Sequence, residues 1–403
     1  MGLKIVLFLC FLGVSTSFAQ QMFNVKDFGA KASPQNEDTQ AFLDTWKAAC
    51  SSGGEATFYV PEGTYYTGAL SFIGPCKNLT RMTFTVKGTL KAFTDLGKFA
   101  KDGAWIMFGW VNDLTVNGGG VFDGQGTASW GKNKCGNQKY CNLLPTSLKF
   151  HASKNVVLQD VTSLNSKFFH IAVLQSTNFK VTGVTVTAPG DSPNTDGIHI
   201  ERSVGVTISH TNIGTGDDCI SIGEGNSHVS IDNVNCGPGH GISVGSLGKY
   251  PYEGDVDGVT VTSSTFTKTK NGIRIKSWQG SPKKTLARNM TFDNLVMNNV
   301  QNPIIIDQEY CPSKRCGAQT PSLVQIKDVT FKNIRGTASS ENAVTLTCSS
   351  GYPCQNLVLE DINFNYDGSA TWNYVKGHEI PAKAFCSSVK ASYKGVQIPP
   401  PCQ

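Results

Sequence analysis

The feature that most constrains the fold of this 403-residue chain is a short pattern that returns along most of its length. Each copy begins with a polar residue or glycine and has apolar residues at the next, third and sixth positions, as in Asn155 followed by Val156, Leu158 and Val161. Further copies, some of them partial, begin at Asp113, Asn178, Gly205, His228, Gly258, Asn289, Asp328 and Asn356. The central copies lie roughly 23 to 31 residues apart, which fits one coil of a parallel β-helix better than a propeller blade of about 40 residues.

A second family of short apolar strands lies between these copies. Its members are Ile198-His199-Ile200, Ile220-Ser221-Ile222, Ile242-Ser243-Val244, Ile273-Arg274-Ile275 and Val344-Thr345-Leu346. Stacked coils would bury the apolar members in layers and turn the residues between them outward. We therefore expect an all-β chain that folds as a right-handed parallel β-helix.

One segment has the period of an amphipathic helix. Residues Thr39 to Cys50 place Ala41, Phe42, Trp46 and Ala49 on one face, with Asp38 as the expected N-cap. This helix would cover the open N-terminal end of the stack. A stack of this kind has one continuous core, so we expect a single parallel β-helix domain over residues 20–403.

The first residues are typical of a secretory signal peptide. Lys4 precedes an apolar run from Ile5 to Leu12, and the small residues Ser17 and Ala19 suit cleavage after residue 19. A membrane anchor would need about 20 apolar residues, and no later stretch is long enough. We expect a secreted, extracellular protein that has no membrane association once residues 1–19 are removed.

The cysteines and sequons agree with an oxidising, extracellular location. Loss of Cys10 with the signal leaves 12 of the 13 cysteines, an even number that suits disulfides. The pairs close enough in sequence are Cys219/Cys236, Cys348/Cys354, Cys386/Cys402, Cys135/Cys141 and Cys311/Cys316, although spacing alone leaves connectivity open. The last two pairs lack a histidine at zinc-site spacing, which favours disulfides over metal ligands. Asn78 and Asn289 begin glycosylation sequons.

The net charge is mild. Removal of Lys4 lowers the formal charge from +5 to +4, which is compatible with an anionic partner. Nucleic acid is a poor candidate, because the chain has no run of Lys or Arg and a secreted route removes it from most polynucleotides.

Polar residues fall in register in front of the second strand family. Asp196, Asp218, His240 and Asn271 each stand two residues before the first apolar position of a coil, and the first two intervals are both 22 residues. They should therefore occupy one equivalent position on successive coils, with neighbours about 4.8 Å apart.

Three more charged residues should join this strip. Asp217 lies one residue before Asp218, where a turn could bring it to the same surface, and Arg274 and Lys276 fall on the outward face of the next coil. Crowded carboxylates raise the pKa of at least one member, which supplies an acid beside a base, as glycoside hydrolysis requires.

Other interpretations of the strip remain open. A calcium site could use the same carboxylates, since Ca²⁺ takes six to eight oxygen ligands, but the histidine, arginine and lysine argue against it. A calcium site is therefore the less favoured interpretation. The remaining histidines lack comparable support and are expected to be structural: His151, His170, His199, His210, His228 and His378.

At these residues the chain resembles the polygalacturonase family of glycoside hydrolases, and within it the plant pollen-type exopolygalacturonases. The matching motifs are Asn194-Thr195-Asp196, Gly216-Asp217-Asp218, Gly239-His240-Gly241 and Arg274-Ile275-Lys276, in the order and spacing of the family. The likeness covers nearly all of the mature chain, including Val25 to Ala30.

The resemblance implies hydrolysis of α-1,4-linked galacturonic acid in de-esterified pectin, with inversion, and without a metal or cofactor. It implies that Asp217 is the general acid and that Asp196 and Asp218 hold and activate the water. His240 would support protonation of the acid, Arg274 and Lys276 would bind substrate carboxylate, Tyr310 matches a substrate-binding tyrosine, and Asn194 would orient the site.

The resemblance favours exo action, and endo action remains the alternative. We expect a monomer. A calcium-dependent pectate lyase and a non-catalytic wall-binding β-helix protein are the less favoured alternatives. The difference between exo and endo action depends on whether loops close one end of the cleft. Residues Thr127 to Pro145 and Tyr250 to Asp257 are the candidates for such walls.

Overall fold

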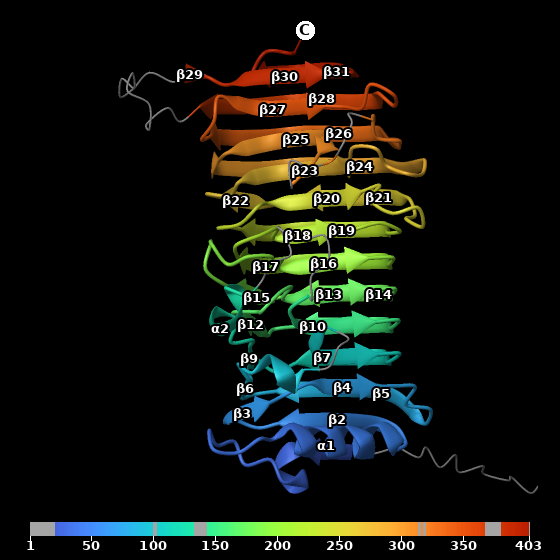
Figure 1. Cartoon of the computed structure of the whole chain (residues 1–403), viewed down its shortest axis with the longest axis vertical. Helices are drawn as coiled ribbons and strands as arrows, with labels where there is room; N and C mark the ends of the chain where they lie inside the picture. Colours follow the sequence, from blue (N-terminus) through green and yellow to red (C-terminus); the bar gives the residue numbers. More distant parts are fainter. Residues whose placement is uncertain are drawn as a thin grey trace, which may run out of the picture.

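A computed structural model describes residues 21–99, 103–132, 143–312, 316, 320–366 and 380–402. These residues form a right-handed parallel β-helix, a column of stacked coils that runs from the N-terminal end to the C-terminal end of the molecule (Figure 1). The predicted all-β fold is confirmed. Among the described residues, no helix is both long and apolar enough to cross a membrane.

One face of the column is an eleven-stranded parallel sheet, here called the site sheet. From the N-terminal to the C-terminal end its strands are β4 (Leu70–Ile73), β7 (Ala104–Gly109), β10 (Thr146–His151), β13 (Ile171–Leu174), β16 (Ile198–Glu201), β18 (Ile220–Ile222), β20 (Ile242–Leu247), β23 (Asn271–Trp278), β25 (Asn302–Tyr310), β27 (Asn342–Thr347) and β30 (Lys383–Ser387). The predicted second strand family belongs to this sheet. It also includes Ile304 to Ile306 in β25, which the pattern had not identified.

The other strands form a twenty-stranded sheet that wraps the remaining two faces. Its strands are β1 (Gln21–Asn24), β2 (Gly54–Val60), β3 (Thr64–Thr67), β5 (Leu79–Val86), β6 (Thr89–Ala92), β8 (Asn112–Asn117), β9 (Val121–Asp123), β11 (Lys154–Gln159), β12 (Thr162–Leu164), β14 (Thr177–Thr182), β15 (Thr185–Thr187), β17 (Val204–Gly214), β19 (Ser227–Cys236), β21 (Val256–Thr262), β22 (Thr265–Thr267), β24 (Thr285–Val300), β26 (Val324–Ala338), β28 (Cys354–Tyr366), β29 (Ile380–Pro381) and β31 (Val389–Ile398). Long strands such as β17 bend between the two faces, so that one half pairs with β14 and the other with β15.

The first residue of each predicted repeat adopts the left-handed conformation. Asn155 and Asn178 have φ values of 56° and 54°, and the other copies, including His228, share this geometry. Only glycine, asparagine and aspartate visit this region readily, which explains the polar or glycine start of the pattern. The apolar position that follows is in register from coil to coil, as in the pairing of Val156 with Phe179 and of Phe179 with Val206.

The asparagines of these turns also bond to one another. The side-chain amide of Asn155 donates to Asp113 at 2.9 Å, and that of Asn178 donates to Asn155 at 3.2 Å. The polar start of the repeat therefore closes each turn and links it to the turn below.

The core is one continuous column of apolar side chains. Near the N-terminal end it contains stacked rings, with the centroids of Phe58 and Phe84 4.3 Å apart. Under the site sheet it contains a file of fully buried isoleucines, including Ile198, Ile220 and Ile242. At about 25 cal/mol per Å² of buried apolar surface, this stacking is the main stabilising contribution to the fold.

The predicted capping helix is present as α1 (Thr39–Ser51), which covers the first coil (Figure 1). Its buried face includes Phe42 and Trp46, and the Trp46 ring lies 4.9 Å from that of Phe72. The predicted N-cap position is confirmed, but without a side-chain cap. Asp38 occupies the N-cap position, but its carboxylate makes no cap and instead accepts the backbone N–H of Lys31 at 2.8 Å, fixing the preceding loop.

Three short helical segments complete the described elements: η1 (Val25–Phe28), η2 (Leu96–Lys98) and α2 (Thr127–Trp130).

The disulfides largely follow the predicted pairs. Cys219–Cys236, Cys311–Cys316, Cys348–Cys354 and Cys386–Cys402 are bonded, and Cys50–Cys76, which spacing had not identified, joins α1 to the loop after β4. Cys135 and Cys141 lie outside the described residues, as do the signal segment and His378.

The left-handed turn positions give a stability test. Asn178→Ala should lower the free energy of unfolding by about 1–2 kcal/mol, because alanine resists this conformation, and Asn178→Gly should cost less. Lys180→Ala, on the exposed face of the same strand, is the control and should change stability by no more than about 0.5 kcal/mol. Chemical denaturation measures all three, and an alanine variant at least as stable as the glycine variant would contradict this explanation of the repeat.

Candidate active site

The predicted polar file is formed by the pairing of the site sheet. Ile198 pairs with Ile220, and Ile220 with Ile242, so the residues two positions earlier lie on adjacent coils. Backbone hydrogen bonds continue this register upstream, with the N–H of Gly197 donating to the carbonyl of Asp218 at 2.9 Å. Asp196, Asp218 and His240 are therefore neighbours.

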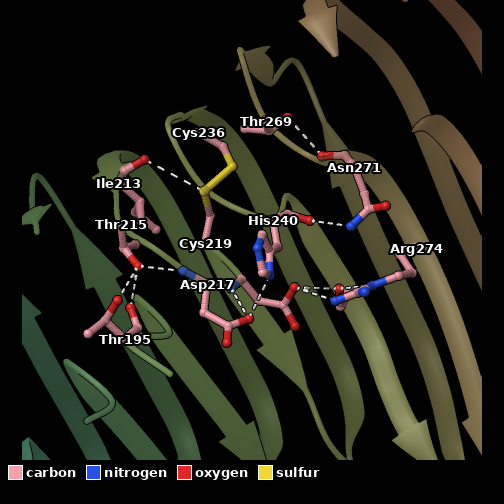
Figure 2. Close-up of a disulfide and its surroundings, with 12 residues drawn as sticks. Thr195, Ile213, Thr215, Asp217, Cys219, Cys236, His240, Thr269, Asn271 and Arg274 are labelled. Carbon is pink, nitrogen blue, oxygen red and sulfur yellow. Dashed lines mark hydrogen bonds and ion pairs between the residues drawn. A yellow bond between two sulfur atoms is a disulfide. The ribbon is translucent and has the colours of Figure 1, made fainter. Parts of the chain in front are cut away.

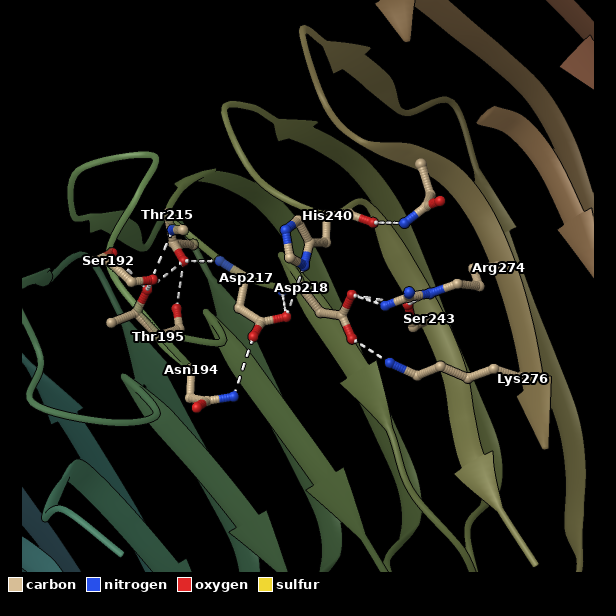
Figure 3. Close-up of polar contacts among 12 residues, drawn as sticks. Ser192, Asn194, Thr195, Thr215, Asp217, Asp218, His240, Ser243, Arg274 and Lys276 are labelled. Atoms are coloured by element: carbon tan, nitrogen blue, oxygen red, sulfur yellow. Dashed lines mark hydrogen bonds and ion pairs between the residues drawn. The ribbon is translucent and has the colours of Figure 1, made fainter. Parts of the chain in front are cut away.

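Asp217 joins the file from the turn before Asp218 (Figure 3). Its Oδ1 accepts the backbone N–H of Asp218 at 2.8 Å and lies 3.0 Å from Nδ1 of His240. Its Oδ2 accepts a longer hydrogen bond, 3.3 Å, from the side-chain amide of Asn194. The Asp217 side chain is 19% exposed, so the carboxyl is oriented on both sides and still reaches the surface.

Hydroxyl groups hold the turn that carries Asp217. The Thr215 hydroxyl accepts the backbone N–H of Asp217 at 3.1 Å, and the Thr195 hydroxyl accepts that of Gly216, also at 3.1 Å. The two hydroxyls lie 3.0 Å apart, and Ser192 bonds to that of Thr195 (Figure 3). The threonine of the Asn194-Thr195-Asp196 motif therefore shapes the turn of the following coil.

Glycines flank His240 because neighbouring coils approach closely there. Gly239 and Gly241 have φ values of 151° and 85°. A Cβ on Gly241 would lie 2.1 Å from the carbonyl oxygen of Asn271, and one on Gly239 would lie 2.9 Å from that of Asp217. The Asn271 amide donates to the His240 carbonyl at 3.0 Å, so the fourth member of the file fixes the third.

A disulfide ties two of these coils together behind the polar groups. Cys219 follows Asp218 directly and is bonded to Cys236, which lies just upstream of the Gly239-His240-Gly241 turn (Figure 2). Both cysteines are buried. The bond therefore anchors the backbone on either side of the site.

Asp218 is held by both predicted cations. Its Oδ1 accepts from Arg274 at 2.7 Å and from the Ser243 hydroxyl at 2.9 Å, and its Oδ2 accepts from Lys276 at 3.0 Å (Figure 3). The Asp218 side chain is only 2% exposed, whereas that of His240 is 31% exposed. Asp218 is therefore a buried ion-pair centre beneath a more open Asp217–His240 pair.

The two buried carboxyls of the file have opposite electrostatic environments. Burial raises the pKa of Asp196 well above its usual range, and the charges of Asp217 and Asp218 raise it further. A hydrogen bond from Ser221 lowers this pKa but does not outweigh them. Burial also acts to raise the pKa of Asp218, but the charges of Lys276 and Arg274 outweigh it and lower the value to about 2. The free site therefore favours a proton on Asp196 and a charge on Asp218.

Tyr310 lies at the end of β25, beside the cations. The Lys276 ammonium is 5.4 Å from the centre of the Tyr310 ring, and Tyr310 pairs in register with Trp278. All eight predicted catalytic and substrate-binding residues are thus brought to one stretch of the site sheet and its entry turns.

Several polar residues of the site were not predicted. The middle, outward residues of the second strand family form their own file, in which His199, Ser221, Ser243 and Arg274 are in register. Ser221 lies 2.8 Å from His199, and Ser243 accepts a bond from Arg274 at 3.0 Å. His199 had been assigned to the structural histidines, although its place between two isoleucines already put it on this outward face.

The other structural histidines lie elsewhere. His170 is fully buried and bonds to Ser163 at 2.8 Å, His210 and His228 take left-handed turn positions, and His151 packs edge-on against Trp110.

A metal would fit poorly among these groups. One ligand atom from each of Asp217, Asp218 and His240 lies within 4.8 Å of the others, which is close enough for an ion. Both Asp218 oxygens, however, already accept from cations, so an added Ca²⁺ would lie beside two positive charges and lack the six to eight oxygens it prefers.

Both sequon asparagines are exposed. Asn78 lies in the turn before β5, and Asn289 lies in β24, where its amide donates to Asp257 at 2.6 Å.

Comparisons with known proteins agree with this geometry. The family model described as Glycosyl hydrolases family 28 matches residues 50–386. An exopolygalacturonase of Platanus acerifolia is 47% identical over 378 residues, covering 94% of this chain and 97% of that protein. An exopolygalacturonase of Zea mays is 43% identical over 373 residues, covering 93% and 88%.

Solved structures support the fold at much lower identity. The exopolygalacturonase of Thermotoga maritima is similar with a TM-score of 0.72 and 17% identity, covering 93% of this chain and 92% of that one. The polygalacturonase of Erwinia carotovora has a TM-score of 0.73 and 21% identity, covering 94% and 99%.

The opposite pKa shifts predict opposite effects of two matched substitutions. A raised pKa means that the folded state gains stability from the protonated form, and this gain is lost as pH rises through the folded value. Asp196→Asn should therefore raise the melting temperature at pH 7 relative to the parent, and the difference should vanish near pH 3.

Asp218→Asn should behave in the reverse way. A lowered pKa gives stability that is present above the unfolded value and is lost as pH falls towards about 2. The variant should be less stable by about 3–5 kcal/mol at pH 7, because it leaves Arg274 and Lys276 buried without a counter-charge, and this deficit should shrink below about pH 4. Thermal unfolding from pH 2 to 8 measures both variants. The charge assignment would be contradicted if both substitutions changed stability in the same direction and with the same pH dependence.

Proposed function

Because the chain belongs to glycosyl hydrolase family 28, we propose that it is a secreted polygalacturonase that hydrolyses α-1,4-galacturonosidic bonds of de-esterified pectin with inversion. The observation that carries this proposal is the pairing of an oriented, partly exposed carboxyl at Asp217 with a buried, charge-paired carboxyl at Asp218. An acid that reaches substrate beside a fixed anion is the arrangement that glycoside hydrolysis needs.

In this proposal Asp217 is the general acid. Its Oδ2 accepts a long hydrogen bond, 3.3 Å, from Asn194, so this oxygen can turn its proton towards the leaving glycosidic oxygen. The Nδ1 atom of His240 bonds to Oδ1, which keeps the carboxyl in place. We assign His240 to support the protonation of this carboxyl through that contact. As the bond between the anomeric carbon and the leaving oxygen breaks, the proton of Asp217 completes the new hydroxyl group.

Asp218 is poorly suited to act as a nucleophile. Carboxyl groups about 5–5.5 Å apart are typical of retaining enzymes, and one oxygen of Asp217 lies within 4.8 Å of one oxygen of Asp218, so this pair is close enough to be considered. Both Asp218 oxygens are nevertheless occupied by Arg274 and Lys276, and the side chain is 2% exposed. Its lone pairs are therefore not free to attack a sugar.

Water is the nucleophile that the site favours. We assign Asp196 and Asp218 to hold it. In the reacting complex the proton that Asp196 holds in the free site has passed to Asp217, which leaves Asp196 ionised and able to accept the proton that the water loses as it bonds to the anomeric carbon. Turnover therefore returns the proton to Asp196. The raised pKa of Asp196 makes its ionised form the stronger base of the two. Direct attack by water inverts the configuration, so an α-linked substrate yields a β-product first.

We assign substrate recognition to the basic residues of the site. Arg274 and Lys276 offer further N–H donors beyond those used by Asp218, and such donors suit the carboxylate of an acidic sugar. Tyr310 provides an aromatic face next to Lys276.

We further propose exo action by a monomer. The support for exo action is the similarity to the Platanus and Zea exopolygalacturonases over more than nine-tenths of the chain. We also propose removal of residues 1–19 as a signal peptide, and glycans at Asn78 and Asn289, whose exposure leaves them accessible. Residues Thr127 to Pro145, a proposed wall of the cleft, are described only in part.

Asp217→Asn should lower kcat on polygalacturonate by at least about a hundredfold, since general acid catalysis contributes that much or more, while the melting temperature is retained. Asp191→Asn, an exposed carboxyl in the neighbouring turn, is the matched control and should retain the parent rate. Activity is measured as the release of reducing ends from polygalacturonate. An active Asp217→Asn protein would refute the assignment of Asp217 as the general acid.

The products provide a separate test of reaction type. Early digestion of a long polymer should release galacturonic acid monomer, appearing first as the β-anomer by proton NMR, with no absorbance from an unsaturated uronate and no loss of rate in chelator. A ladder of oligomers would indicate endo action, initial α-anomer would indicate retention, and chelator-sensitive unsaturated product would indicate a lyase.

A further inference from the structure

The loop between β20 and β21 presents two exposed aromatic side chains. Tyr250 is 43% exposed and Tyr252 is 66% exposed, and their rings stack 5.3 Å apart at an interplanar angle of 5°. Exposed aromatic groups that cover no core often mark binding surfaces. The pair contributes little to packing, so its arrangement calls for another explanation.

The loop is held rigidly by a buried carboxylate. Glu253 is 4% exposed, and its carboxylate accepts the backbone N–H groups of Gly248 at 2.5 Å, Lys249 at 2.8 Å and Tyr250 at 2.9 Å. The next residue is anchored in turn, because the N–H of Gly254 donates to Glu224 at 2.7 Å. A surface fixed in this way loses little conformational entropy when it binds a ligand.

The loop is linked to the active site by ring contacts. The Lys249 ammonium lies 5.1 Å from the ring centres of both Tyr250 and Trp278. Trp278 packs edge-on against Tyr310 at 5.4 Å, and Lys276 lies 5.4 Å from the same Tyr310 ring. We call the four rings of Tyr250, Tyr252, Trp278 and Tyr310 the aromatic platform. Lys249 bridges its two ring pairs, and Lys276, which bonds to Asp218, lies next to the Tyr310 ring.

We propose that the aromatic platform, with Lys249, binds the part of a galacturonate chain that extends beyond the residue being cleaved. Aromatic faces pack against the apolar C–H faces of sugar rings, and a lysine beside them pairs with a uronate carboxylate. An anionic sugar chain is favoured because Lys249 lies over two rings of the platform, and the carboxylate of the nearby Glu253 is taken up by backbone N–H groups.

This inference rests on the proposed function. It also gives the segment from Tyr250 to Asp257 a role in binding the substrate. Tyr250 to Asp257 was expected to be a wall that closes the cleft. As a binding surface it would instead increase the rate on long substrates, whereas a wall would restrict them.

The test compares kcat/KM on digalacturonate, which fills only the positions on either side of the cleaved bond, with kcat/KM on hexagalacturonate. The parent enzyme should prefer hexagalacturonate. The double variant Tyr250→Ala/Tyr252→Ala should reduce that preference about twofold to twelvefold, since aromatic stacking contributes about 0.5–1.5 kcal/mol. Lys249→Gln should reduce it in the same direction.

Tyr66→Ala is the matched control. Tyr66 also has a lysine over its ring, Lys91 at 6.0 Å, but it lies on β3 near the N-terminal end. Its substitution should leave the preference unchanged. A parent enzyme without a preference for hexagalacturonate, or a double variant that keeps the parent preference, would overturn the proposal.

A binding measurement separates this proposal from the proposed function. In the Asp217→Asn background, which avoids turnover, calorimetry should show that the two tyrosine substitutions weaken binding of hexagalacturonate by about twofold to twelvefold. Equal affinity would overturn the aromatic platform even if the parent enzyme hydrolyses pectin. A parent enzyme that binds hexagalacturonate through the tyrosines and cleaves nothing would refute the hydrolase and leave the platform supported.

Discussion

The parallel hydrogen bonding between coils of the site sheet is the constraint on which the rest of the structure depends. It places Ile198, Ile220 and Ile242 one above another, and thereby sets the polar residues two positions upstream at neighbouring places about 4.8 Å apart. A slip of one residue would turn the isoleucines outward and separate the carboxyls. The apolar core and the polar file are therefore two consequences of one register.

That register brings like-charged carboxyl groups together, and cations from a neighbouring coil stabilise the charge on one of them. Three carboxyls are brought together where burial penalises charge, but only Asp218 receives both cations. Asp196 is left with burial and two like charges, so the proton is favoured there. Asp217, which is more exposed and is held by Asn194 and His240, is free to meet substrate. The three carboxyls thus differ through their surroundings, although they are chemically alike.

Much of this could be predicted because it depends on spacing. The coil length, the two strand families and the alignment of Asp196, Asp218 and His240 follow from intervals in the chain. The contacts of Ser221 and Ser243 were missed, because a serine between apolar residues does not reveal which carboxyl it will meet. The Cys50–Cys76 bond was missed since it joins a helix to a coil that only the folded stack brings together. Asp38 takes the predicted N-cap position, but its carboxylate accepts a loop N–H and no N–H of the helix, and the strand at Ile304 was not identified from the pattern.

Neutron diffraction from deuterated crystals of the ligand-free protein near pH 5 would test the central claim most directly, because it locates the shared proton. The account predicts a deuteron on Asp196 and none on Asp218. A deuteron on Asp218, or an ionised Asp196, would contradict the account. Burial would then not have placed the proton on Asp196, or the two cations would not have kept Asp218 ionised.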